Sequence, residues 1–320
     1  MASAATTTAS PVVAIVGPTA SGKTSLSLDL AAALGGEVVN TDAMQVYRGM
    51  DIGTAKLPPA ERRGIPHHLL DTLDVREPAT VAQFQAWARA AIADIRGRGA
   101  TPVLVGGSAL YTRAILDRFD FPGTDAAVRE RYEAELEEVG SAVLHARLRE
   151  LDPVSAERIE VENGRRVVRA LEVIELTGQP FSARLPVQEY VDPATVQVGV
   201  AIERDVLEER IRLRVRQMFD EGLLEEVERL LPAGLAEGRT ASLAIGYRQA
   251  MAVLAGEMSL DEAIERTVIA TRKFARRQMA WWRNDPRITW VAHDDPDRVA
   301  QALAAVRDVM RPGRPDDRNA

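Results

Sequence analysis

One segment constrains the fold of this 320-residue chain more than any other. Residues 17–24 read Gly-Pro-Thr-Ala-Ser-Gly-Lys-Thr, which is the complete G-x-x-x-x-G-K-[ST] pattern of a phosphate-binding loop. The apolar run 12–16 precedes this loop, and the amphipathic run 25–34 follows it. A strand, a glycine-rich loop and a helix in this order place consecutive backbone N–H groups at a helix N-terminus, where they can bind a phosphorylated ligand.

The loop supplies the candidate ligand-binding residues Gly17, Pro18, Thr19, Ala20, Ser21, Gly22, Lys23 and Thr24. Lys23 is expected to reach a terminal phosphate oxygen as a point charge. The Thr24 hydroxyl is expected to ligate a Mg²⁺ ion that bridges two phosphate groups. The loop pattern alone leaves open whether the ligand is a nucleoside triphosphate or another diphosphate.

The composition indicates an enzyme-sized globular protein without a membrane segment. The chain is 46% hydrophobic, which is enough for one large core or for a core with a subdomain. It has no apolar run near the ~18 residues of a membrane span, and its first 47 residues carry one basic residue, Lys23. The absence of cysteine excludes disulfides and thiolate metal sites. We therefore expect a cytoplasmic protein that binds no membrane, and we expect it to be a monomer.

Short apolar runs alternate with amphipathic segments, which predicts a doubly wound α/β fold with a parallel sheet of the P-loop nucleotide-hydrolase type. Strands are expected at 12–16, 37–40, 102–105 and 196–202, and crossover helices at 23–34, 80–97, 108–117 and 204–231. Between 124 and 186 the pattern changes to consecutive charged amphipathic helices, which predicts an all-helical subdomain inserted into the sheet domain. The predicted catalytic core comprises 11–123 and 187–310, with a flexible tail at 1–10 and a disordered tail at 311–320.

The ends of two predicted strands carry information about the chemistry. The run 37–40 leads to Asp42, and the carboxyl ends of parallel strands face the ligand crevice. Asp42 is therefore the candidate base, although an Asp at this position could also serve only to cap its loop. The run 102–105 ends in Gly-Gly-Ser (106–108), where NTP-hydrolysing proteins carry an Asp that holds the magnesium water shell. This difference weakens the prediction of an NTPase.

A basic segment stands out in a chain whose net charge of −7 argues against a general polyanion-binding protein. Residues 266–287 contain seven basic residues and one acidic residue, Asp285. The segment overlaps a predicted helix that begins after Ser259, with Glu262 completing a capping box, and ends near Trp282. It is either a solvated helix face or a surface that follows RNA phosphates, and the segment alone does not decide between them.

The phosphate loop and several further motifs resemble the tRNA dimethylallyltransferase family. The most specific is the run 42–56, Asp-Ala-Met-Gln-Val-Tyr-Arg-Gly-Met-Asp-Ile-Gly-Thr-Ala-Lys. The others are His-His-Leu-Leu-Asp (67–71), Gly-Gly-Ser-Ala-Leu-Tyr (106–111), Arg-Arg-Val-Val-Arg-Ala-Leu-Glu-Val (165–173), Thr-Gly-Gln-Pro (177–180), Arg-Ile-Arg-Leu-Arg (210–214), Gly-Leu-Leu-Glu-Glu-Val (222–227), Ala-Ile-Gly-Tyr-Arg (244–248) and 271–283. They follow the family's order and extend from residue 12 to about residue 290.

The resemblance implies transfer of a dimethylallyl group from dimethylallyl diphosphate to N6 of adenosine 37, in tRNAs that read codons beginning with U. The loop then binds the prenyl diphosphate and Mg²⁺, with Thr24 as metal ligand. Asp42 takes a proton from the weakly nucleophilic amine, and Arg214 stabilises the leaving diphosphate. Arg210 and Arg214 lie four residues apart, which places them on one face of a helix.

The same resemblance implies that the target adenine leaves the stacked anticodon loop and enters the active site. Contacts with the tRNA anticodon stem-loop are implied for Asp42, Ala43, Met44, Gln45, Ser108, Arg129, Arg165, Arg166 and Arg169. Two departures from the family pattern affect these contacts: Glu160–Gly164 stands where a His-Pro-Asn-Asp-like stretch is usual, and Ser108 stands where Thr is commoner.

Other classes of protein share parts of this pattern. A P-loop small-molecule kinase would have the loop, a strand-end Asp and clustered arginines, but it gives no reason for the run 42–56. An adenylate isopentenyltransferase that acts on free nucleotide would share the chemistry, whereas the insertion and the basic segment favour a macromolecular acceptor. A non-enzymatic RNA-binding NTPase switch is disfavoured by the missing carboxylate after the run 102–105.

Overall fold

The computed structural model describes residues 10–119, 121–184 and 188–311. The predicted tails at 1–10 and 311–320 lie outside these ranges, apart from their innermost residues.

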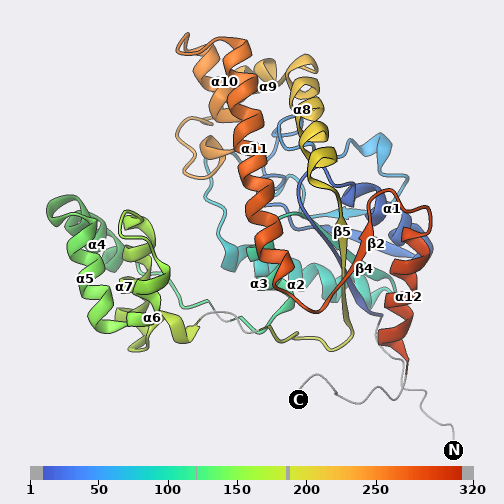
Figure 1. The fold of residues 1–320 in the computed structure, drawn as a ribbon, viewed down its shortest axis with the longest axis horizontal. Helices are drawn as coiled ribbons and strands as arrows, with labels where there is room; N and C mark the ends of the chain where they lie inside the picture. The colour runs from blue at the N-terminus through green and yellow to red at the C-terminus, as the bar shows by residue number, and fades with distance from the viewer. Residues whose placement is uncertain (1–9, 120, 185–187, 312–320) are drawn as a thin grey trace, which may run out of the picture. The chain divides into compact units, whose positions relative to one another are not determined.

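The chain divides into two compact units (Figure 1). The core unit consists of the residues before 117 and after 189, and the insert unit is 117–189. The sequence predicts the insertion at 124–186. The unit in the structure extends further because its two flanking segments pair with each other, with the Arg118 N–H donating to the Glu189 carbonyl over 2.8 Å.

The core unit is built on one parallel sheet with the strand order β3-β2-β4-β1-β5-β6. The strands are β1 Val12–Val16, β2 Gly36–Asn40, β3 His67–His68, β4 Thr101–Val105, β5 Thr195–Ala201 and β6 Ile288–Ala292. The predicted parallel α/β fold is confirmed, and four strands lie within one residue of their predicted positions. The sequence pattern does not predict β3, which has two residues, or β6, which lacks the continuous apolar run of a strand buried on both faces.

Alternate residues of β1 face two different hydrophobic clusters, as expected for a strand covered on both sides. Val13 and Ile15 pack with side chains of α1 (Lys23–Leu34) and α12 (Arg298–Met310). Val12 and Ala14 belong to a larger cluster that includes side chains of α2 (Val81–Gly97) and α3 (Ala109–Leu116). Figure 1 shows α1 near α12, and α2 near α3. Helices on both faces bury the sheet and leave its carboxyl edge for the site.

Four further helices complete the core unit: α8 Arg204–Asp220, α9 Leu223–Leu230, α10 Tyr247–Leu254 and α11 Leu260–Arg283. The prediction of one helix over 204–231 is wrong, because Gly222 interrupts it with a left-handed backbone conformation (φ +103°). The helix α11 begins where it was predicted: the Ser259 side chain accepts a hydrogen bond from the Glu262 N–H over 3.2 Å.

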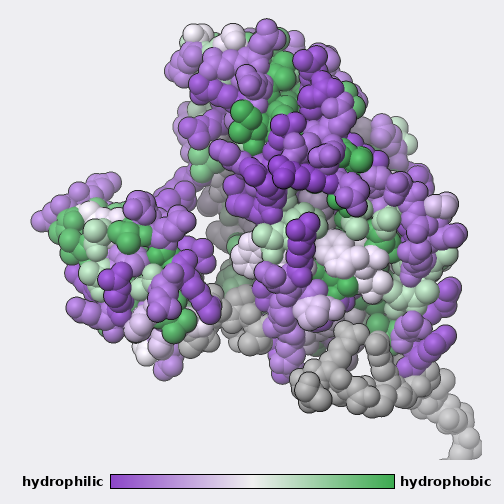
Figure 2. Space-filling view, in the orientation of Figure 1, coloured by the Kyte–Doolittle hydropathy of each residue, from purple (hydrophilic) through white to green (hydrophobic). Residues whose placement is uncertain are grey.

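The basic segment lies on α11 and beyond its end, and most of its charges face solvent. Lys273, Arg276, Arg277 and Arg283 are exposed, and hydrophilic side chains cover much of the surface around α8 and α11 (Figure 2). The two adjacent tryptophans differ, because Trp282 is fully buried whereas Trp281 is 47% exposed. Among the helices that the structure describes, neither α11 nor any other has an apolar stretch long enough to cross a membrane.

The insert unit contains four α-helices in its described residues: α4 Ala126–Val139, α5 Ser141–Leu151, α6 Pro153–Arg158 and α7 Gly164–Thr177. They enclose a hydrophobic cluster of their own, which includes Leu144, Leu148, Val167 and Leu171. Because the unit has its own core and its own helix caps, such as the Asp125 carboxylate at the start of α4, it is organised independently of the sheet.

Candidate functional site

A cavity of about 280 Å³ lies where the loops after β1, β2 and β4 meet at the carboxyl edge of the sheet. It is lined by Thr19, Ala20, Gly22, Lys23, Thr24, Ser25, Asp42, Gln45, Thr54, Ala55, Val105, Gly106, Gly107, Arg214 and Gln278. The phosphate loop and the candidate base therefore share one cavity, to which α8 contributes Arg214 and α11 contributes Gln278.

The phosphate loop has the backbone that its glycines permit. Gly22 has a positive φ of +98° immediately before α1, and a side chain on Gly17 would lie 3.1 Å from the Val200 carbonyl oxygen of β5. Ala20 also adopts the left-handed region (φ +63°), which a residue with a side chain seldom does outside functional turns. The Lys23 ammonium donates a hydrogen bond back to the Pro18 carbonyl over 2.5 Å, so the loop closes around its own lysine.

Asp42 is held in the cavity by its backbone as well as by its carboxylate. The Asn40 side chain accepts from the Asp42 N–H (2.8 Å) and donates to the carbonyls of Asp42 (3.0 Å) and Leu69 (3.1 Å). The Met44 N–H donates to the Asp42 carboxylate over 2.8 Å. β2 thus delivers the carboxylate, and an amide at its last residue fixes the turn that follows.

Burial and mutual charge set the protonation of the three ionisable groups. Burial and, to a smaller extent, the neighbouring Arg214 charge lower the pKa of the Lys23 ammonium to about 7, and the Asp42 charge opposes this shift. Burial raises the pKa of the Asp42 carboxyl, against the Met44 N–H and the Lys23 charge, which hold it down. Burial also lowers the pKa of the Arg214 guanidinium. An Asp with a raised pKa beside two cations is suited to accept a proton near an anionic ligand.

Arg210 and Arg214 differ from the other arginines of α8. Arg214 lines the cavity, and the Arg210 guanidinium lies 3.9 Å from the position of a Cβ on Gly22. By contrast Arg212 pairs with Glu209 over 2.5 Å, and Arg216 is exposed. The helix therefore presents one basic face to the phosphate loop.

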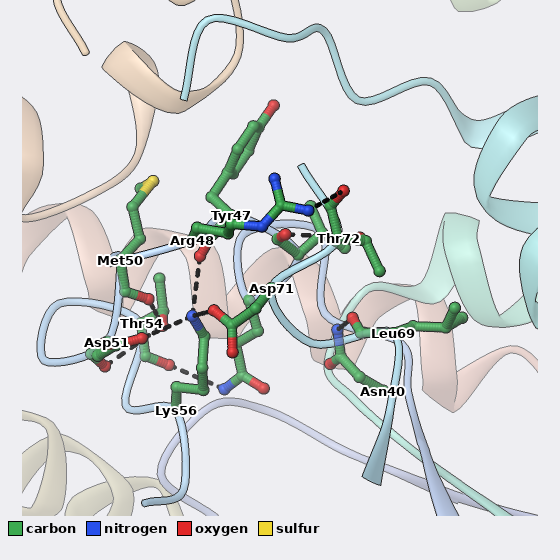
Figure 3. A network of polar contacts seen from close by, with 12 residues as sticks. Asn40, Tyr47, Arg48, Met50, Asp51, Thr54, Lys56, Leu69, Asp71 and Thr72 are labelled. Carbon is green, nitrogen blue, oxygen red and sulfur yellow. Dashed lines mark hydrogen bonds and ion pairs between the residues drawn. The ribbon is translucent and has the colours of Figure 1, made fainter. Parts of the chain in front are cut away.

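The run 42–56 continues from Asp42 along the cavity wall and is anchored by a buried lysine. The Lys56 ammonium donates to the Tyr47 carbonyl (2.8 Å) and to the carboxylates of Asp51 and Asp71 (both 2.6 Å) (Figure 3). The Gln45 side chain donates to the Thr54 carbonyl over 3.0 Å. The segment therefore folds back on itself and places Gln45 beside the loop residues that line the cavity.

A buried carboxylate holds the same segment from the other side. Glu226 of α9 accepts hydrogen bonds from the N–H groups of Asp51 (3.1 Å), Ile52 (2.8 Å) and Gly53 (3.3 Å). The Tyr247 hydroxyl donates to it over 2.5 Å, and burial together with the Glu226 charge raises the pKa of that hydroxyl. These contacts fix the backbone that leads to Thr54 and Ala55 in the cavity wall.

The remaining residues predicted for the site lie at its edges or in the insert unit. Gly17, Pro18 and Ser21 belong to the phosphate loop without lining the cavity, and Ser21 is buried. Ala43 and Met44 follow Asp42, and Ser108 follows Gly107 directly before α3; none of these three lines the cavity.

The four arginines predicted to grip tRNA fall into two pairs within the insert unit. Arg129 and Arg169 form ion pairs with the fully buried Glu172, over 2.5 Å and 2.8 Å, and Arg169 also donates to the Pro122 carbonyl over 2.8 Å. Arg165 and Arg166 are exposed and have no ion pair among the residues that the structure describes. Arg165 and Arg166 are thus the available cations, whereas the other two hold the insert unit together.

Several residues that line the cavity were not predicted from the sequence: Ser25, Thr54, Ala55, Val105, Gly106, Gly107 and Gln278. Thr54 and Ala55 stand inside the family-specific run and could have been proposed from it. Gln278 lies in the basic helix, where only its position on the buried face, four residues before Trp282, distinguishes it from its charged neighbours.

The depressed pKa of Lys23 predicts proton uptake when a diphosphate binds. In the free protein Lys23 is mostly neutral at pH 8, because its pKa is about 7, and a bound anion favours the protonated form. Calorimetric titration with Mg²⁺ and inorganic diphosphate at pH 8, in two buffers of different ionisation enthalpy, should report uptake on the order of one proton per site. The Lys23→Arg variant, whose cation keeps its proton, should lack this uptake. Equal uptake in both proteins would contradict the assignment.

Comparison with known sequences places the chain in a family. A family model described as IPP transferase matches residues 45–285. A protein of Nocardioides sp. named tRNA dimethylallyltransferase is 71% identical over 296 residues, which cover 92% of this chain and 96% of the relative. A protein of Salinispora arenicola with the same name is 58% identical, covering 95% of this chain and 88% of its own.

Solved structures agree with the sequence relatives. The full-length tRNA isopentenylpyrophosphate transferase of Bacillus halodurans is 40% identical with a TM-score of 0.68, covering 94% of this chain and 98% of its own. A eukaryotic dimethylallyltransferase acting on tRNA is 27% identical with a TM-score of 0.81, covering 96% of this chain and 81% of its own. The chain therefore belongs to the IPP transferase family of tRNA dimethylallyltransferases.

Proposed function

We propose that this protein transfers the dimethylallyl group of dimethylallyl diphosphate to N6 of adenosine 37 in tRNAs that read codons beginning with U. The observation that carries the proposal is the cavity in which a complete phosphate loop faces Asp42. The loop supplies a site for the diphosphate, and the carboxylate supplies a base for the amine. The curated relatives named above are tRNA dimethylallyltransferases.

The donor's diphosphate lies on the phosphate loop. The amides at the start of α1 and the two cations Lys23 and Arg214 surround the position that it takes. No cluster of three or more Asp, Glu or His side chains that could hold a metal occurs in the described ranges. Thr24, whose side chain is exposed at the end of the phosphate loop, would supply a hydroxyl ligand to Mg²⁺, which commonly keeps water and phosphate oxygens among its ligands. When bound, the ion neutralises charge on the diphosphate.

The reaction exchanges one bond for another. The N6 amine attacks the allylic carbon, the carbon–oxygen bond to the diphosphate breaks, and the diphosphate leaves with the bonding electron pair. Asp42 accepts the proton that the amine loses, while Lys23 and Arg214 stabilise the charge on the leaving group. The cavity can hold these groups together because its carboxylate and its cations come from different elements around one edge of the sheet.

The acceptor is a macromolecule rather than a free nucleotide. Gln45 lies in the cavity wall and takes part in holding the flipped adenine, as enzymes that act on nucleobases require. The insert unit grips the anticodon stem-loop through the exposed pair Arg165 and Arg166, and the exposed arginines of α11 add a second basic surface. A free-nucleotide enzyme would have no use for either surface.

Replacing Asp42 by Asn tests the base. The amide keeps the oxygen that accepts the Met44 N–H, so the loop should retain its shape while the proton acceptor is lost. We expect the single-turnover rate at saturating donor and tRNA to fall by about 10²–10⁴-fold. In the wild type the rate should fall as the pH drops through the Asp42 pKa, at a pH above that of an ordinary aspartate, because burial raises this pKa.

The tRNA affinity of the Asp42→Asn variant, measured with the same stem-loop, serves as the control and should change little. A variant that reacts at the wild-type rate would place the base elsewhere.

The exposed pair Arg165 and Arg166 provides a test of tRNA binding. Their double replacement by Ala should weaken binding of an anticodon stem-loop. The magnitude of the log–log salt dependence should fall by about 0.7–0.9 for each phosphate contact that is lost. Binding of inorganic diphosphate should stay the same. The measurement is a fluorescence anisotropy titration at several salt concentrations.

The matched control is the double replacement of Arg149 and Arg158 by Ala. Both are exposed arginines of the insert unit, and their replacement changes the net charge by the same amount. If both double variants bind alike, the effect is one of net charge, and the contact assignment is wrong. Arg169 is left intact because its loss would unbalance the buried Glu172.

A further inference from the structure

A single side chain connects the phosphate loop to the loop that follows β4. The Gln278 side chain of α11 accepts a hydrogen bond from the Thr19 N–H and donates one to the Gly107 carbonyl, both over 2.9 Å. Gln278 is only 4% exposed, and both ends of its amide are satisfied. Gln278, which is 259 positions away from Thr19 in the sequence, thus fixes the Thr19 backbone in the phosphate loop.

The two glycines after β4 make room for this arrangement. A Cβ on Gly107 would lie 2.2 Å from the Gln278 amide nitrogen, and a Cβ on Gly106 would lie 2.2 Å from the Thr41 hydroxyl oxygen. Both distances are shorter than a Cβ contact allows, so a side chain at Gly107 would displace the Gln278 amide, and one at Gly106 would clash with the Thr41 backbone. Gly107 does not adopt a left-handed backbone. Gly107 is therefore required by the approach of the Gln278 amide, and Gly106 by the approach of the chain that leads from β2 to Asp42.

The hydrogen bond to Gln278 gives the backbone amides of the phosphate loop two different roles. The Thr19 N–H donates to Gln278 and so does not face a ligand, and it precedes Ala20, whose backbone is left-handed (φ +63°). The amides nearer the helix, from Gly22 to Thr24, remain at the N-terminus of α1 for an anion. A loop that contains two glycines can adopt many conformations. A hydrogen bond that fixes Thr19 therefore reduces the conformational entropy that the loop loses when it binds the anion.

We infer that Gln278 is a positioning residue for the donor: it holds the phosphate loop in the conformation that binds the diphosphate, and Gly107 is present to admit it. The inference rests on the proposed function for the identity of the donor as a diphosphate, but it does not depend on the acceptor.

The first test is binding of inorganic diphosphate with Mg²⁺ to the full chain by calorimetry. Gln278→Met preserves the length of the side chain and removes both hydrogen bonds, and we expect the affinity to fall by about tenfold. With the complete reaction the Michaelis constant for the donor should rise by a similar factor, with a smaller change in kcat. Gln217→Met, on the exposed face of α8, is the matched control and should bind as the wild type does.

The second test is a double-mutant cycle with Gly107→Ala. In the wild-type background the new methyl group displaces the Gln278 amide, so this variant should lose diphosphate affinity although Gln278 is still present. In the Gln278→Ala background the methyl group enters vacated space and should cause no further loss. A merely structural role for either residue would give additive losses of stability without this pattern in affinity.

Wild-type affinity in Gln278→Met, or additive losses of affinity in the cycle, would overturn the inference. Should Gln278→Met fail to fold, Gly107→Ala alone decides, since it leaves the glutamine in place. A wild-type protein that binds no diphosphate at all would refute the proposed donor instead, so the two failures are distinguishable.

Discussion

The site depends on an imbalance of charge that the fold holds in a small space. Lys23 and Arg214 face a single carboxylate, Asp42, in a cavity of about 280 Å³. Burial disfavours all three charges, and the two cations also repel each other, which is why the Lys23 pKa drops to about 7. A bound diphosphate supplies the missing negative charge. The arrangement therefore favours an anionic donor. The raised pKa of the neighbouring Asp42 carboxylate makes it a suitable base for a weakly nucleophilic amine.

Buried polar side chains that bind backbone atoms maintain this arrangement in the absence of ligand. Asn40 fixes the turn that contains Asp42. Lys56 and Glu226 hold the two sides of the run 42–56. Gln278 fixes Thr19 in the phosphate loop. Asn40, Glu226 and Gln278 come from three different elements, β2, α9 and α11, and each of them binds backbone atoms of a loop. Preorganised loops of this kind place charges where the leaving group develops its own, which is the usual source of electrostatic catalysis.

Short sequence motifs predict the residues at the center of this site. The residues that hold them in place could not be predicted, because they lie far away in the sequence. The phosphate loop, the strand before it and Asp42 after β2 follow from short motifs and from the rule that parallel strands end at one edge. Gln278 could not be found in this way, because its partners Thr19 and Gly107 lie far from it in the chain. The same holds for Arg129 and Arg169. The sequence predicts two cations that are free to bind tRNA, whereas in the structure both form ion pairs with Glu172.

The most direct test of the account is to follow label from radiolabelled dimethylallyl diphosphate, with Mg²⁺, into two competing acceptors. One is an anticodon stem-loop with adenosine at position 37, and the other is AMP. We expect label in the stem-loop, and none when position 37 carries a purine without the 6-amino group. Preferential labelling of AMP would contradict it, as would ATP hydrolysis at enzyme-like rates, about 1 s⁻¹ or faster, without any prenyl donor.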